Sequence, residues 1–120
     1  MAGNKYGAKR TYSELCQRTF SSKAEARRGE ELRLLEMAGE IADLQYQMRF
    51  ILCKKPKVSI TIDFVYLDHI HWISPKKGGK WASGNKVYED VKGMGETREF
   101  RVKRIWLLQK EGIEIRLVKI

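Results

Sequence analysis

The sequence VSITIDFVYL, residues 58–67, is rich in β-branched and aromatic side chains, which favour a β-strand. Strand alternation predicts that Ile62 and Phe64 share one face and that Asp63 points to the other. A second sequence, YEDVKG at residues 88–93, ends another predicted strand over residues 86–92. Side chains two apart on a strand share a face, so Asp90 and Lys92 are expected to project together. Glu89 is expected on the opposite face, in a structural or exposed position.

The sequences on either side complete an α+β pattern. A helix is expected to begin at Ser22, because SKAE at residues 22–25 fits a capping box, and to stop at Gly39. Alternating residues predict strands over 44–52 and 113–118, and Thr97 is a good N-cap for a helix that reaches about Lys110. The order α-β-β-β-α-β predicts an α/β (α+β) fold with a mixed central sheet flanked by helices.

The length, net charge and cysteine content limit the kinds of protein that this sequence can encode. The 120 residues are expected to form a single domain spanning 1–120. Lys and Arg total 24 against 15 Asp and Glu, so the net charge is +9 and a polyanion is the expected partner. A merely basic protein is the alternative. No apolar run reaches the roughly 18 residues that span a bilayer, and the two cysteines have no metal spacing, so we expect reduced thiols, a cytoplasmic location and no membrane partner.

Two basic segments are expected to lie outside the sheet. Residues 1–20 are predicted to be a flexible N-terminal arm. Residues 68–86 are predicted to be a long connection, whose part over 70–86 is a basic loop that carries Trp72 and Trp81. Two roles for these tryptophans stay open: they stack on exposed bases, or they cover a sheet edge.

The acids and the lysine suggest phosphodiester hydrolysis. That reaction needs an activated water and relief of negative charge on the phosphate, which one or two Mg²⁺ ions supply when carboxylates hold them. We expect Asp63 and Asp90 to be metal ligands, with the Val91 backbone carbonyl as a third oxygen. Lys92 would orient or deprotonate the water. Glu25 has two readings that the residues leave open, as the partner of a helix cap or as a further acid aimed at the metal.

Basic side chains near these acids and in the two basic segments are candidates for DNA contact. His69 and His71 form only a weak candidate zinc pair. The candidate DNA-binding residues are Lys5, Lys9, Arg10, Lys23, Arg27, Arg28, Lys76, Lys77 and Lys80.

Six segments resemble a family of small phage-encoded proteins: NKYGAK (4–9), FSSKAEARR (20–28), LxxAGxI (35–41), IDFVY (62–66), EDVKG (89–93) and GIEIR (112–116). That family is similar to the PD-(D/E)XK nuclease superfamily, which includes restriction endonucleases and Holliday-junction resolvases. The resemblance implies a restriction-endonuclease-like αβββαβ core, with residues 70–86 as an insertion. It also implies catalytic roles for Glu25, Asp63, Asp90 and Lys92, and adds Glu25 to the metal ligands. Ile62 stands where the superfamily motif has proline.

The expected function is therefore a Mg²⁺-dependent DNA endonuclease, with Mn²⁺ able to substitute. Small size and the resemblance favour a homodimeric resolvase of branched or junction DNA, acting in phage recombination in the cytoplasm of a bacterial host. The alternatives are a general or site-specific phage nuclease that cuts duplex DNA, and a non-catalytic DNA-binding module of the same fold.

Overall fold

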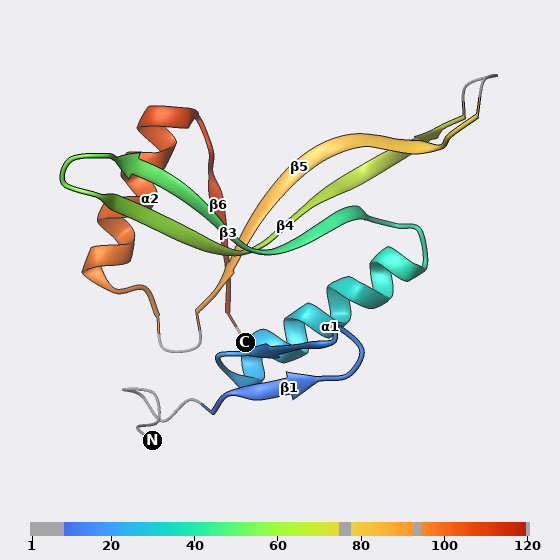
Figure 1. Cartoon of the computed structure of the whole chain (residues 1–120), viewed down its shortest axis with the longest axis horizontal. Helices are drawn as coiled ribbons and strands as arrows, with labels where there is room; N and C mark the ends of the chain where they lie inside the picture. The colour runs from blue at the N-terminus through green and yellow to red at the C-terminus, as the bar shows by residue number, and fades with distance from the viewer. Residues whose placement is uncertain (1–8, 75–77, 93–94, 120) are drawn as a thin grey trace.

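The structure, a computed structural model, describes residues 9–74, 78–92 and 95–119. Figure 1 shows a strongly twisted sheet with one helix on each side. No helix in these described ranges is long and apolar enough to cross a membrane. The elements in chain order are β1 (Thr11–Ser13), β2 (Arg18–Phe20), α1 (Lys23–Met37), β3 (Ala42–Cys53), β4 (Val58–Ile73), β5 (Trp81–Val91), α2 (Arg98–Glu111) and β6 (Ile115–Val118).

The central sheet has the strand order β3-β4-β5-β6. The first three strands are antiparallel neighbours, whereas β6 runs parallel to β5 after the chain crosses over through α2. The protein is therefore α+β with a mixed four-stranded sheet, as the sequence predicted. From α1 onward the element order is the expected α-β-β-β-α-β.

Both helix starts follow from their capping residues. The Ser22 hydroxyl accepts a hydrogen bond from the Glu25 backbone N–H at 3.1 Å, and Thr97 does the same for Phe100 at 3.1 Å. Each side chain satisfies a backbone donor that the first helical turn leaves without a partner. Gly112 ends α2 in the left-handed conformation at φ 71°, which glycine adopts without a steric cost.

The prediction of a flexible arm over residues 1–20 is wrong for its second half. Residues 11–20 form the β1–β2 hairpin, and Phe20 at its end is only 2% exposed. Phe20 lies against Gly29 of α1, where an added Cβ would stand 2.7 Å from the ring. The hairpin is ordered because this aromatic side chain enters the core, a long-range contact that polar local sequence does not reveal. Residues 1–8 lie outside the described part of the chain.

The predicted loop over 70–86 is also wrong in its described residues, because β4 and β5 continue as a paired hairpin. We call the paired segments 69–73 and 81–85 the arm; they project from the sheet at the upper right of Figure 1. The register shifts between Asp68 and His71, and a Cβ on Gly84 would lie 2.5 Å from the Asp68 carbonyl oxygen. Gly84 thus serves a close backbone approach within a strand rather than a loop. Residues 75–77 are not described.

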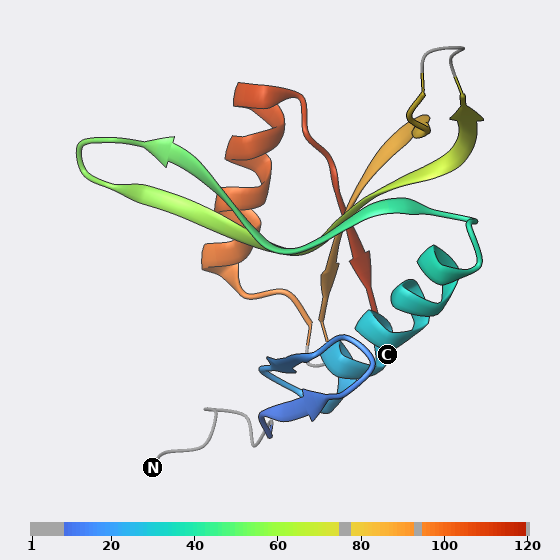
Figure 2. The same ribbon diagram turned by 45° about the vertical axis from the view of Figure 1, so that its right-hand side comes forward.

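Two apolar cores lie on opposite sides of the sheet, one under α1 and one under α2 (Figure 2). Phe64 packs in the α1 core, but Ile62, two residues earlier on β4, packs in the α2 core. The prediction that these two side chains share a face is therefore wrong. The faces exchange at Asp63, between the pairs Tyr46↔Phe64 and Met48↔Ile62.

Gln47 is the residue of β3 that faces this exchange point. Its φ of 54° is in the left-handed region that residues other than glycine seldom adopt. In a regular strand, side chains alternate between the two faces along the whole length. The left-handed conformation of Gln47 interrupts this alternation, so the two strands exchange their faces here. The candidate acids lie at this exchange of faces.

Candidate active site

Asp63 and Asp90 lie where β4 and β5 separate. The two strands pair from Ile73↔Trp81 as far as Phe64↔Glu89, after which β4 pairs only with β3, and β5 with β6. At this fork the Asp63 N–H donates to Asp90 Oδ1 at 3.1 Å, and the Val91 N–H donates to Asp63 Oδ2 at 2.9 Å. Where β4 and β5 diverge, their backbone N–H groups can no longer donate to the neighbouring strand. The two carboxylates accept these hydrogen bonds instead.

Glu25 reaches the same place from the first turn of α1. Its side chain is only 6% exposed, and Ser21 Oγ donates to its Oε1 at 2.9 Å. Gln47 Nε2 donates to Glu25 Oε2 at 3.1 Å and to Asp63 Oδ1 at 3.3 Å. The Glu25 backbone N–H completes the Ser22 cap, whereas its carboxylate accepts from Ser21 and Gln47 and is joined to Asp63 through the Gln47 amide. A metal-binding role for this carboxylate stays a prediction.

Lys92 completes the group, as strand alternation predicted. Its Nζ lies 2.5 Å from Asp90 Oδ2 and 3.6 Å from the centre of the Phe100 ring. The ring attracts the ammonium through its negative face, so α2 helps to hold the lysine in place. A continuous chain of polar contacts runs from Glu25 through Gln47, Asp63 and Asp90 to Lys92.

The acids are crowded enough to resist ionisation. Burial, followed by the negative charges of Asp90 and Glu25, raises the pKa of Asp63 to about 8, and the Val91 N–H and Lys92 offset this only in part. Burial also raises the pKa of Glu25; the hydrogen bond from Ser21 opposes that shift and the charge of Asp90 adds to it. A site with this excess of negative charge favours any cation that can enter it.

The donor chemistry fits a hard divalent cation. Carboxylate, amide and backbone carbonyl oxygens are the ligands that Mg²⁺ and Mn²⁺ take in proteins. As the side chains are placed, no group of three or more His, Cys, Asp or Glu residues within the described ranges is arranged to hold a metal ion. The carboxylates of Glu25 and Asp63 instead accept hydrogen bonds from the Gln47 amide, and Asp90 pairs with the ammonium of Lys92. The Val91 carbonyl stays a predicted ligand.

The chain's family is shown by one comparison. A family model described as "Protein of unknown function (DUF1064)" matches residues 3–119. The chain belongs to the DUF1064 family. No curated protein and no solved structure matched in the other two comparisons. The DUF1064 region includes Glu25, Asp63, Asp90 and Lys92, so the candidate site lies wholly within it.

Arg10, one of the predicted DNA-binding residues of this DUF1064 chain, lies beside the candidate site. It lines a hollow of about 310 Å³ together with Thr19, Ser21, Glu25 and Gln47. A cation at the rim of an acidic site is well placed for a phosphate, because phosphate contacts position nucleic acid without reading its sequence. The predicted residues Lys9, Lys23, Arg27 and Lys80 are also exposed, whereas Lys5, Lys76 and Lys77 lie outside the described residues.

Arg28 has a different place from the one expected. Its Nε and Nη2 donate to the two carboxylate oxygens of Glu89, each at 2.9 Å, and Glu89 is fully buried. Tyr66 also donates its hydroxyl hydrogen to Glu89. These hydrogen bonds raise the pKa of Arg28, which keeps it charged inside the protein. A DNA contact by Arg28 would compete with this pairing. Glu89 faces away from Asp90 in a structural position, as alternation predicted.

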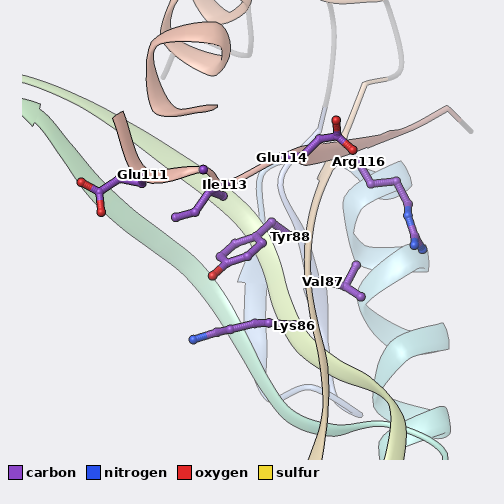
Figure 3. Close-up of a pocket in the computed structure, with 8 residues that line it drawn as sticks. Lys86, Val87, Tyr88, Glu111, Ile113, Glu114 and Arg116 are labelled. Atoms are coloured by element: carbon purple, nitrogen blue, oxygen red, sulfur yellow. The ribbon is translucent and has the colours of Figure 1, made fainter. Parts of the chain in front are cut away.

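A second hollow, of about 510 Å³, lies between β5 and the end of α2 and contains none of the candidate catalytic residues. Figure 3 shows Val87 and Arg116 on the side of α1, with Tyr88 and Lys86 on the other side. This alternation along β5 is the same one that separates Glu89 from Asp90. The candidate catalytic residues therefore lie at the fork and not in this hollow.

Gln47 is the site residue that sequence reasoning missed. Along residues 44–50 it alternates with apolar neighbours just as Gln45 does, so nothing local distinguishes it from a solvent-facing side chain. Its contact with Glu25 and Asp63 depends on the exchange of faces on β4, which no short sequence pattern predicts.

We expect Gln47→Glu to destabilise the protein without divalent metal and Mg²⁺ to reverse the loss. A fourth carboxylate would replace the donor that holds Glu25 and Asp63 together, at a cost of about 1–3 kcal/mol near pH 8. Urea unfolding with EDTA and with Mg²⁺ measures both effects. Gln45→Glu, on the same strand and exposed, is the matched control. If the two variants behave alike, Gln47 does not organise the acids.

Proposed function

We propose that this protein is a metal-dependent DNA endonuclease that hydrolyses phosphodiester bonds. The chain of contacts that joins Glu25, Asp63, Asp90 and Lys92 through Gln47 carries the proposal. Three acids from α1, β4 and β5 are gathered beside a lysine although burial, together with their mutual repulsion, raises the pKa values of Glu25 and Asp63. A structural network would pair these charges, as the Arg28–Glu89 pair does on the other face.

The residues have separate roles in this proposal. Asp63, Asp90, Glu25 and the Val91 carbonyl would hold Mg²⁺ or Mn²⁺. Such an ion, when bound, lowers the pKa of a water molecule and offsets charge on the phosphate. Lys92 donates to the attacking water or to a phosphate oxygen, and Phe100 restrains its side chain.

The element order supports a restriction-endonuclease-like core. The resemblance to PD-(D/E)XK nucleases implies αβββαβ, and the chain has that order from α1 to β6. The Asp and the Asp-x-Lys pair implied by that resemblance lie together at the β4–β5 fork.

Branched DNA is the proposed substrate and a homodimer the proposed assembly. The net charge of +9 suits a polyanion. Helix α2 exposes Val102, Ile105 and Trp106, and a mostly apolar hollow of about 510 Å³ runs between this helix and Val58. A two-fold pair joined there would present two active sites, which suits symmetric cuts in a four-way junction.

The test is cleavage of a four-way junction, a linear duplex and a single strand in Mg²⁺. We expect paired symmetric nicks in the junction, and their loss in Asp90→Asn but not in the control Asp43→Asn, an exposed aspartate of β3. Sedimentation of the same samples reports the dimer. Preferential cutting of linear duplex would favour the duplex-nuclease alternative. DNA binding without metal-dependent cutting of any substrate would leave only a binding module and overturn the proposal.

A further inference from the structure

The arm carries two exposed tryptophans away from both cores. Trp72 is 47% exposed and Trp81 is 52% exposed, although tryptophan is usually buried for most of its surface. Cross-strand pairs join Trp72 to Ala82 and Ile73 to Trp81. The arm projects beyond the rest of the fold in Figure 1. The Trp72 Nε1–H donates to the Gly39 carbonyl oxygen at 3.5 Å, whereas Trp81 is the more exposed of the two rings. Of the two roles that the sequence left open, this exposure favours stacking on exposed bases, most of all for Trp81.

The sequence around the two tryptophans is basic. Residues 68–86 contain four lysines and one aspartate. Lys80 Nζ lies 4.9 Å from the centre of the Trp72 ring, so a cation and an aromatic face are presented together. Proteins that bind single-stranded nucleic acid combine these two features, because the cations follow the phosphates while the bases stack on the rings.

We infer that the arm binds unpaired nucleotides of the DNA substrate, with the Trp81 ring stacking on a base. Bases inside a duplex already stack on their neighbours, so only unpaired bases offer a free face to an exposed ring. Branched DNA supplies such bases where its strands separate. The inference rests on the proposed function for the identity of the nucleic acid, but it concerns binding and not cleavage.

The sheet sets the distance between the arm and the acids. Trp81 pairs with Ile73, which lies ten residues along β4 from Asp63, about 33 Å at the strand rise of ~3.3 Å per residue. At ~3.4 Å per nucleotide of one DNA strand, this length corresponds to about ten nucleotides. The curvature of the arm in Figure 2 makes this an upper bound. The unpaired bases would therefore lie within about ten nucleotides of the cut phosphate.

The experiment uses tryptophan fluorescence in EDTA, so that no metal-dependent cutting occurs. In one protein Trp81 is the only tryptophan, through Trp72→Phe and Trp106→Phe. In the control, Trp106 of α2 is the only one, through Trp72→Phe and Trp81→Phe. The probes are an oligothymidine strand, a junction with a single-stranded flap, and a blunt duplex of equal length. We expect the strand and the flap to quench Trp81 and not Trp106, with the duplex giving little change.

Affinity supplies the second measurement. Loss of one stacked ring weakens binding by about 5- to 100-fold, so Trp81→Leu should bind the oligothymidine strand that much less tightly. Tyr12→Leu, which removes an exposed aromatic side chain of β1 outside the arm, should bind as the unaltered protein does. Unchanged affinity in Trp81→Leu, or equal quenching of Trp81 by blunt duplex, would overturn the inference. Because no cleavage is measured, that failure leaves the nuclease proposal standing, and a failed nuclease test leaves this one standing.

Discussion

Replacing Asp63 with asparagine is expected to abolish DNA cleavage and, at the same time, to stabilise the metal-free protein. Cleavage should fall by at least about a thousandfold, because the substitution removes a carboxylate that we propose as a metal ligand while keeping the shape of the side chain. Stability should rise because an uncharged side chain costs less to bury at the fork and no longer repels Asp90 and Glu25.

The effect on stability has a definite pH dependence. The pKa of Asp63 rises from an ordinary 3.8 to about 8 in the folded protein, so folding favours the neutral carboxyl. This contribution is fully present below about pH 4 and is lost as the pH rises through 8. Asparagine does not titrate, so Asp63→Asn should gain about 1–3 kcal/mol over the unaltered protein near pH 8.5 and little near pH 4, after allowance for solvent screening.

Urea unfolding at the two pH values measures the gain, and thermal unfolding with Mg²⁺ measures what the substitution removes. A ligand at a hundred times its dissociation constant stabilises a folded protein by about 2.7 kcal/mol, and Asp63→Asn should lose this response. Asp43→Asn, an exposed substitution of the same kind, should change neither quantity. If Asp63→Asn is less stable than the unaltered protein at pH 8.5, the ionised Asp63 does not destabilise the folded protein, and this prediction is wrong.

Glu89→Ala is expected to cost about 3–5 kcal/mol of folding stability. The change leaves the Arg28 guanidinium and the Tyr66 hydroxyl without the buried carboxylate that accepts from both. Urea unfolding measures the loss. Glu31→Ala is the control, because Glu31 contacts the same arginine at 3.4 Å from an exposed position and should cost less than about 0.5 kcal/mol.

The same substitution should also lower cleavage by protein that is still folded. Arg28 lies one turn after Glu25 on α1, and Glu89 is next to Asp90 on β5, so this ion pair fixes the spacing of two candidate metal ligands. The double variant Arg28→Met with Glu89→Leu replaces the pair with apolar side chains and should recover much of the stability. Equal destabilisation by Glu31→Ala and Glu89→Ala would contradict the role given to the buried pair.

Short-range patterns predicted the parts of the fold that depend on local physics. The Ser22 and Thr97 caps act within one helical turn, so both helices begin where the sequence indicated. Alternation over a few residues was enough to bring Asp90 and Lys92 together and to turn Glu89 away. The proximity of Asp63 to Asp90 followed from two strands that are neighbours along the chain and in the sheet.

The parts that were missed depend on contacts between distant residues. Phe20 orders a basic segment only because Gly29 leaves room for its ring. Gly84 resembled a loop residue, although its missing side chain accommodates a backbone carbonyl within a strand. The link made by Gln47 requires the local reversal of alternation at Asp63, where tertiary packing overrides the period of the strand.

The exchange of faces on β4 has a consequence for the cooperativity of unfolding. Phe64 belongs to the core under α1 and Ile62 to the core under α2, and the acids lie at the boundary between the two. Segments with separate cores can open as separate units. A cation held by Glu25 from one unit and Asp90 at the boundary would link the two openings, so that the protein unfolds as a single unit only when its site is filled.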